Sequence, residues 1–129
     1  MTRWCAWIPA ILWAGLISWL SAQPRVPRVG PEFPFKDKVG HWLLFCVLGW
    51  CVAWALQRAH NLRLPKVALL AMLITSAYGV ADEFHQRFVP NRTCDGMDWL
   101  ADTFGAGVAV ATFYVYESRR STKANRQTT

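Results

Sequence analysis

The hydrophobic residues of this chain fall into four long blocks, separated by short polar or proline-containing segments. The blocks cover residues 4–22, 39–56, 67–85 and 99–116. Each is close to the roughly 17 to 25 residues that a helix needs to cross about 30 Å of hydrocarbon. The third block reaches this length only if its helix continues through the polar residues from Asp82 to His85. The pattern predicts an all-α polytopic membrane protein, a bundle of about four transmembrane helices in one domain over residues 1–117.

The segments around these blocks set three further expectations. The first block follows Arg3 and resembles a signal peptide, but Trp19 and Leu20 crowd the positions where a peptidase requires small side chains, so an uncleaved anchor is favoured. Residues 23–38 contain four prolines, which predicts an extended loop on the membrane surface. The basic tail over residues 118–129 is predicted to be disordered and cytoplasmic.

Composition supports a membrane protein and argues against a nucleic-acid-binding protein. The 129 residues are 53% hydrophobic and include eight tryptophans, which collect at membrane interfaces. The net charge of +6 is spread over every connection instead of forming one basic stripe. Lys and Arg favour the second connection and the two termini, so both termini are predicted to be cytoplasmic. The four cysteines show neither a disulfide framework nor a CxxC pattern.

Nearly all the unusual polar residues lie in two segments predicted to face the outer side of the membrane. They are Asp37, Lys38 and His41, then Asp82, Glu83, His85, Gln86, Arg92, Asp95, Asp98 and Asp102. A spacing of three or four residues sorts most of them into three sets, each on one helix face: Asp37 with His41, Asp82 with His85 and Gln86, and Asp95 with Asp98 and Asp102. An ionised Asp102 inside a membrane helix needs a partner, and His41, His85, Lys38 and Arg92 are the candidates. The sequence thus predicts a polar pocket open to the outer surface.

Several of these residues also have simpler roles. Asp95 and Asp98 are placed to cap the fourth helix, and Asp37 the second. Lys38, Arg87 and Arg92 suit interfacial anchoring, although Arg92, in a tight connection, also suits anion binding. Two histidines and several carboxylates satisfy the ligand list of a divalent metal, but no spacing motif ties them together. A structural ion-pair network is therefore favoured, and the sequence predicts no metal and no cofactor.

Two of these segments carry a resemblance to a known family. DKVGHWLLFCVLG and ADEFHQRFVPNRTCDGMDWLADTFGAGVA resemble the VanZ-like family of small bacterial membrane proteins, over residues 37 to about 112. The matching positions are Asp37, Lys38, His41, Asp82, Glu83, His85, Gln86, Phe88, Pro90, Arg92, Asp98, Asp102 and Gly105. One departure is Cys94-Asp95-Gly96, where the family has a Gly-Arg-x-Gly-Ser-like connection. The resemblance implies the bacterial inner (cytoplasmic) membrane and a link to antibiotic resistance, namely reduced sensitivity to the glycopeptide teicoplanin.

Three functions fit these observations. In the first, the protein binds or modifies the headgroup of a cell-envelope lipid or glycolipid. Its candidate catalytic residues are Glu83, His85 and Asp98, and its candidate substrate-binding residues are Lys38, His41, Arg92 and Asp102. In the second, it is a non-enzymatic accessory protein whose polar residues form a packing network. The third is an ion-coupled carrier. It fits least, because a carrier needs ionisable groups near the bilayer midplane and the ionisable groups of this chain are predicted to lie at one edge of the membrane. The sequence leaves open whether it is an enzyme.

Overall fold

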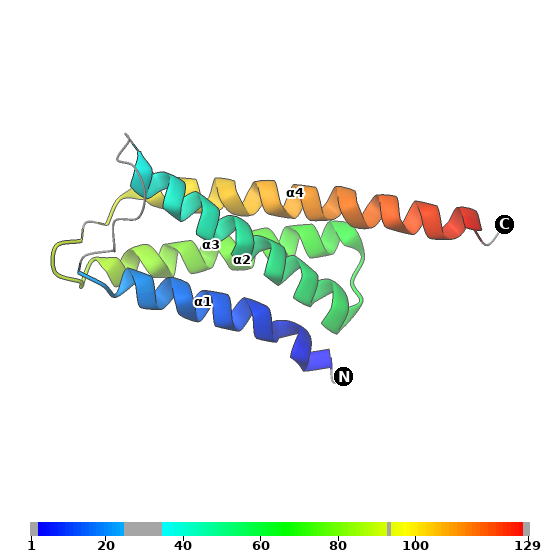
Figure 1. The fold of residues 1–129 in the computed structure, drawn as a ribbon, viewed down its shortest axis with the longest axis horizontal. Helices are drawn as coiled ribbons and strands as arrows, with labels where there is room; N and C mark the ends of the chain where they lie inside the picture. The colour runs from blue at the N-terminus through cyan, green and yellow to red at the C-terminus, as the bar shows by residue number, and fades with distance from the viewer. Residues whose placement is uncertain (1–2, 25–34, 93, 128–129) are drawn as a thin grey trace.

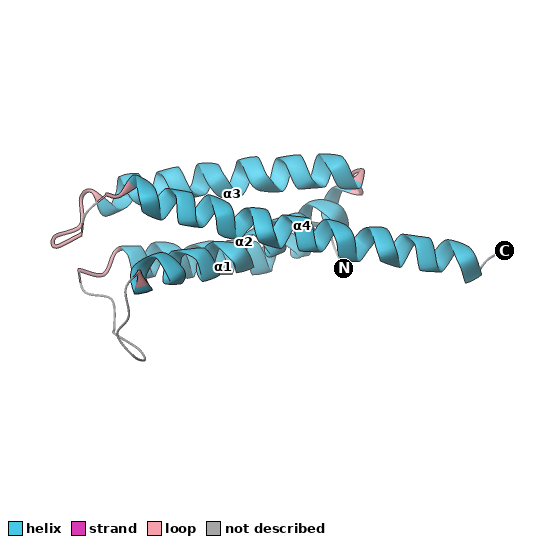
Figure 2. Cartoon of the chain, turned by 90° about the horizontal axis from the view of Figure 1, so that it is seen from above, coloured by secondary structure: helices cyan, strands magenta, loops and turns pink. Residues whose placement is uncertain are grey.

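The computed structural model describes residues 3–24, 35–92 and 94–127. A short 3-10 helix η1 (Arg3–Trp7) leads into α1 (Ile8–Ser21), followed by α2 (Lys36–His60), α3 (Leu64–Gln86) and α4 (Gly96–Gln127). The four α-helices lie side by side, and successive helices run in opposite directions (Figures 1 and 2). The described residues therefore form the all-α bundle that the hydrophobic blocks predicted.

Three of the helices have the length and composition of membrane spans. They cover Arg3–Ser21, Lys36–His60 and Leu64–Gln86. Large apolar side chains such as Leu12, Leu69 and Phe104 are exposed on the outer faces of the bundle, as expected where lipid replaces water. α4 is less apolar, since it carries Asp98 and Asp102 near its start and a polar C-terminal half. It packs against both α2 and α3 in the same bundle.

Several helix boundaries differ from those that hydrophobicity predicted. α2 begins at Lys36, so Asp37 lies in its first turn and Phe35 occupies the cap position without a side-chain cap. α4 continues to Gln127, so the segment from Ser118 to that residue is helical where the sequence predicted a disordered tail. Hydroxyl groups of this segment donate to carbonyl oxygens one turn back, and Arg120 lies 3.5 Å from Glu117. An ion pair between neighbouring turns stabilises a polar helix that no apolar pattern reveals.

The closest helix approach joins α2 to α4. Gly49 lies so near α4 that an added Cβ would be 3.0 Å from Cα of Ala106. A Cβ on Gly105 would overlap the carbonyl oxygen of Trp42 and lie 3.2 Å from the backbone nitrogen of Cys46. Small residues at a crossing allow two backbones to touch. This crossing fixes the spacing between the polar residues that α2 and α4 carry one turn further along.

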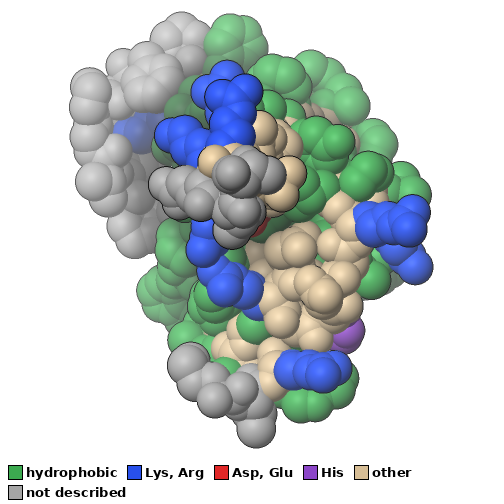
Figure 3. All heavy atoms as spheres, turned by 90° about the vertical axis from the view of Figure 1, so that its right-hand side faces the viewer, with side chains coloured by type: hydrophobic (Ala, Val, Ile, Leu, Met, Phe, Trp, Pro, Cys, Tyr) green, Lys and Arg blue, Asp and Glu red, His purple; other side chains and the backbone are tan. Residues whose placement is uncertain are grey.

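The two ends of the bundle differ in charge. Both termini and the connection between α2 and α3 lie at one end (Figure 1). Lys and Arg side chains stand out on this end face, and almost no acidic side chain is visible (Figure 3). A groove lined by Thr112, Tyr116 and Arg120 runs along α4 there. Acidic residues of the bundle gather at the opposite end, between the connection that leads into α2 and the connection between α3 and α4.

Candidate functional site: an acidic cluster at one end of the bundle

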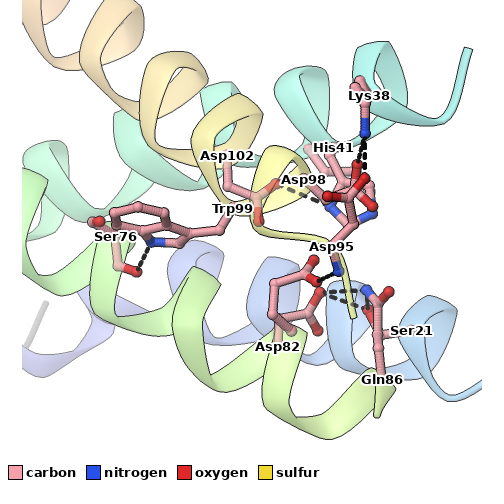
Figure 4. A network of polar contacts seen from close by, with 12 residues as sticks. Ser21, Lys38, His41, Ser76, Asp82, Gln86, Asp95, Asp98, Trp99 and Asp102 are labelled. Carbon is pink, nitrogen blue, oxygen red and sulfur yellow. Dashed lines mark hydrogen bonds and ion pairs between the residues drawn. The ribbon is translucent and has the colours of Figure 1, made fainter. Parts of the chain in front are cut away.

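Side chains from all four helices meet at the acidic end of the bundle (Figure 4). The helices enter this region with polar residues in their terminal turns: His41 in the second turn of α2, Glu83 in the last turn of α3 and Asp98 in the first turn of α4. The contacts divide into three groups, which differ in how completely their hydrogen bonds are satisfied.

The first group joins α1 to α3 and is made of Ser21, Asp82 and Gln86, here called the α1–α3 triad. Ser21 Oγ donates to Asp82 Oδ2 at 2.8 Å. Gln86 Nε2 donates to the same oxygen at 3.0 Å and to Ser21 Oγ at 3.3 Å. All three side chains are buried. Buried polar groups that satisfy one another's hydrogen bonds stabilise the packing of the helices that carry them, so this part of the site has a structural role.

The triad gives a stability prediction. Ser21→Ala removes the donor to Asp82 and the acceptor for Gln86, and it leaves two buried polar groups with fewer partners. We expect it to lower the free energy of unfolding by about 1 to 3 kcal/mol. Denaturation of the purified protein in detergent measures this change. An unaltered unfolding curve would show that the triad does not hold α1 against α3.

The second group is an ion-pair cluster at the more exposed edge of the site. Lys38 Nζ lies 2.8 Å from Asp95 Oδ2 and 2.8 Å from Asp98 Oδ1. Asp95 also caps α4, because its Oδ1 accepts the Met97 N–H at 2.9 Å. The Lys38 ammonium, followed by the Met97 N–H, holds the pKa of the Asp95 carboxyl below its ordinary value. The predicted capping role of Asp95 is confirmed, and the charge of Lys38 is already shared between two carboxylates.

The lowered pKa of Asp95 predicts a pH dependence. A carboxyl with a lowered folded pKa stabilises the protein above its unfolded pKa of about 3.9, and this contribution is lost as the pH falls through the folded pKa. Lys38→Met removes the ammonium, so we expect the pKa of Asp95 to rise towards its ordinary value. Carbon-13 NMR titration of labelled Asp carboxyls measures this shift. An unchanged Asp95 titration in the variant would contradict the ion pair.

The third group brings together His41 of α2, Glu83 of α3 and Asp102 of α4, here called the three-helix cluster. His41 Nδ1 lies 3.0 Å from Asp102 Oδ1, and the two side chains face each other (Figure 4). Glu83 Oε2 accepts the Asp95 N–H at 3.0 Å. The second oxygens, Glu83 Oε1 and Asp102 Oδ2, are buried and have no hydrogen-bond partner among the described residues. In this respect the three-helix cluster differs from the α1–α3 triad.

Contacts between α3 and α4 hold this cluster in place. Ser76 Oγ and Thr103 Oγ1 are 2.9 Å apart, and Trp99 Nε1 donates to the Ser76 carbonyl oxygen at 3.3 Å. Gly79 leaves room for the Asp102 carboxylate, since a Cβ at this position would lie 3.3 Å from Asp102 Oδ2. These contacts are neutral hydrogen bonds and packing, so they orient Asp102 without neutralising it.

The structure brings together most, but not all, of the candidate site residues that the sequence predicted. Lys38, His41, Glu83, Asp98 and Asp102 converge within the three groups. His85 and Asp37 are exposed, and among the described residues neither forms a hydrogen bond or ion pair with the three groups. Arg92 is half-buried in the connection before α4, and its Nε has no partner within the described segments. Of the four candidate partners of Asp102, His41 is the one that contacts it.

Sequence reasoning missed several supporting residues. Ser21 lies at the end of the first apolar block, far from the two polar segments, yet it hydrogen-bonds to Asp82 from a position 61 residues earlier in the chain. Ser76, Trp99 and Thr103 lie within apolar blocks, where single polar atoms gave no signal. The available clue was the buried Asp82, which needs donors that its own helix cannot fully supply.

The three-helix cluster contains the chemical groups of acid–base catalysis and of ligand binding. The His41 imidazole can donate or accept a proton, and Glu83 Oε1 has no hydrogen-bond partner among the described residues. Lys38 and Asp95 are partly exposed, at 28% and 43% of their side-chain surfaces, so the ion-pair cluster lies at the more exposed edge of the site.

Comparison with known proteins assigns the chain to a family. The model of the VanZ/LLP1 family matches residues 6–117, which include all three groups of polar contacts. The chain belongs to the VanZ/LLP1 family. This confirms the resemblance seen in the two polar segments, and it extends the match to the first helix.

A curated relative comes from a eukaryote. The chain is 28% identical over 111 residues to the uncharacterized protein C11E3.10 of Schizosaccharomyces pombe. The alignment covers 85% of this chain and 63% of that relative, so the chain spans less than two thirds of the length of the yeast protein. No solved structure gives a significant match to the chain.

Proposed function

We propose that this member of the VanZ/LLP1 family binds the polar headgroup of a membrane phospholipid or glycolipid at the three-helix cluster, and acts on it there. In a bacterial envelope, a change in such headgroups would alter sensitivity to glycopeptide antibiotics. The similarity to a yeast protein favours a ligand that is present in both kinds of membrane, and lipid headgroups meet this condition.

One observation carries the proposal: two buried carboxylate oxygens of the three-helix cluster meet no hydrogen-bond donor among the residues that the structure describes. Asp102 is fully buried and Glu83 is 5% exposed, yet each keeps one oxygen without a partner in the described chain. A network that serves packing alone satisfies its buried polar groups, as the α1–α3 triad does. Carboxylates that are held by neighbours but left partly unpaired suit a site that completes its bonds with a ligand.

The alternative functions receive less support. A packing network accounts for Ser21, Asp82 and Gln86 but not for the unpaired oxygens of Glu83 and Asp102. An ion-coupled carrier would place its ionisable groups near the bilayer midplane. His41 and Asp102 lie within two turns of the start of their helices, and Glu83 lies in the last turn of α3. Their positions near the helix ends suit contact with headgroups.

The proposed orientation follows from the charge of the two ends. The basic end, with Arg58, Arg63, Lys66 and the basic part of α4, would face the cytoplasm together with both termini. The three-helix cluster would then lie in the outer half of a bacterial inner membrane. α4 would complete the fourth crossing, which places the two termini on one side.

Headgroup binding can be tested with the full chain in lipid nanodiscs. The panel comprises phosphatidylethanolamine, phosphatidylglycerol, phosphatidic acid and a diglucosyl diacylglycerol, each titrated into a phosphatidylcholine background while tryptophan fluorescence and lipid mass spectra are recorded. We expect saturable preference for one headgroup, which Glu83→Gln abolishes and the exposed Asp37→Asn preserves. Equal responses to every headgroup, or a preference that survives Glu83→Gln, would refute the proposal. New lipid masses would show that the headgroup is also modified.

A further inference from the structure

Three metal-ligating side chains converge from three different helices. His41, Glu83 and Asp102 each offer one ligand atom, and these atoms all lie within 4.8 Å of one another. His41 Nδ1 and Asp102 Oδ1 are 3.0 Å apart. Two ligands of one Zn²⁺ or similar ion, each about 2.0 to 2.2 Å from it, are separated by roughly 3 to 4 Å. We propose that the three-helix cluster binds one divalent transition-metal cation of the Mn²⁺ or Zn²⁺ type.

The free oxygens of the cluster support a ligand that is a cation. Asp102 has 0% and Glu83 has 5% of its surface exposed, and Asp102 Oδ2 and Glu83 Oε1 meet no donor from the described residues. The other oxygen of Glu83 is fixed by the Asp95 N–H, while the other oxygen of Asp102 contacts His41 Nδ1, a contact that a cation bound between the two side chains would replace. Glu83 is thus oriented through one oxygen and available through the second, as metal-binding carboxylates commonly are.

The charge balance of the acidic end leads to the same conclusion. The carboxylates in its three groups of polar contacts are Asp82, Glu83, Asp95, Asp98 and Asp102. Lys38 is shared by Asp95 and Asp98, while Asp82 receives neutral donors from Ser21 and Gln86. Within the described chain, Glu83 and Asp102 have only His41 to offset two buried charges. Uncompensated buried charge is costly, and a dication would neutralise it directly.

The donor set selects the class of cation. Ca²⁺ takes six to eight oxygen ligands and Mg²⁺ favours oxygen and water, whereas imidazole together with carboxylates suits Zn²⁺ and Mn²⁺. Three protein ligands leave coordination positions open for water or a phosphate oxygen. The lipid part of this inference rests on the proposed function: a cation would allow an acidic site to hold an anionic phosphate. Metal binding itself requires no lipid.

The test uses the full-length protein in detergent, treated with a chelator and then freed of it. Mn²⁺ is titrated while the electron paramagnetic resonance signal of free Mn²⁺ is followed. We expect one bound ion per chain, and an affinity at least 10-fold weaker in Glu83→Gln and in Asp102→Asn. The control Asp37→Asn, which removes an exposed carboxylate at the same end of α2, should bind as the wild type does. No saturable binding by the wild type, or equal affinity in all variants, would overturn the inference.

Two measurements on the wild type remain decisive if a variant does not fold. Pulsed electron paramagnetic resonance should detect an imidazole nitrogen bound to Mn²⁺, and saturating Mn²⁺ should raise the melting temperature relative to EDTA. Bound Mn²⁺ without a nitrogen ligand would overturn the site. Repeating the headgroup titration in EDTA separates the two proposals. Headgroup preference without metal binding would reject this inference and keep the proposed function. Metal binding without headgroup preference would reject the proposed function and keep this inference.

Discussion

Asp102→Asn is expected to weaken headgroup binding by about 100-fold while the protein still folds. The substitution keeps the size of the side chain and an oxygen for His41, but it removes the negative charge and the free acceptor at Oδ2. Losing one partner of a buried charged contact typically costs 2 to 5 kcal/mol or more, so an effect of about 100-fold is at the lower end of this range. Titration of the preferred lipid into nanodiscs that contain each protein measures it.

Asp82→Asn is the matched comparison for this prediction. Asp82 is also buried, but its contacts are to Ser21 and Gln86 in the α1–α3 triad. We expect its replacement to lower stability and leave headgroup affinity within about 3-fold of the wild type. If Asp82→Asn and Asp102→Asn weakened binding equally and both unfolded easily, the distinction between a structural triad and a ligand-binding cluster would fail.

Gly105→Ala is expected to lower the free energy of unfolding by about 3 kcal/mol or more. Its new methyl group would overlap the carbonyl oxygen of Trp42, and backbone atoms of α2 cannot move aside as a flexible side chain would. Overpacking of a tight contact usually costs 1 to 3 kcal/mol, and a backbone clash lies at the upper end. Because α2 and α4 carry His41 and Asp102, headgroup binding should weaken as well. Chemical denaturation in detergent measures the first effect.

Gly15→Ala is the control for the helix crossing. Gly15 lies within α1, and no side chain or neighbouring helix in the described part of the chain would come within 4 Å of an added Cβ. Alanine is favoured over glycine inside a helix by up to about 1 kcal/mol, so this variant should be as stable as the wild type or slightly more stable. Equal destabilisation by Gly15→Ala and Gly105→Ala would show that the α2–α4 contact is not special.

The sequence predicted the architecture because the bilayer imposes a strict length and composition on each helix. Four apolar blocks predicted the four helices that the structure shows. The polar residues at the edges of those blocks indicated a polar site at one end of the bundle. The helix ends were less predictable. Hydropathy does not detect the polar turns at the start of α2 and at the end of α4, and at the end of α4 an ion pair between neighbouring turns supports the helix.

The composition of the site was predicted more completely than its geometry. Helical spacing placed Asp82, His85 and Gln86 together, but α3 turns only Asp82 and Gln86 inwards and leaves His85 exposed. Spacing along one helix cannot tell which face a neighbouring helix will cover. The three-helix cluster was invisible for the same reason: its ligand atoms come from three helices, so no motif in one segment could reveal it.

The most direct test of the ligand-binding role is the stability of Glu83→Gln in detergent without added metal or lipid. If the cluster is built to bind a ligand, neutralising a buried and partly unpaired carboxylate removes an unfavourable desolvation free energy. The variant should then melt at the same temperature as the wild type or higher. In the nanodisc titration, the same variant should no longer show headgroup preference. If the cluster serves packing alone, Glu83→Gln should melt several degrees lower with headgroup behaviour unchanged, and that result would contradict the account.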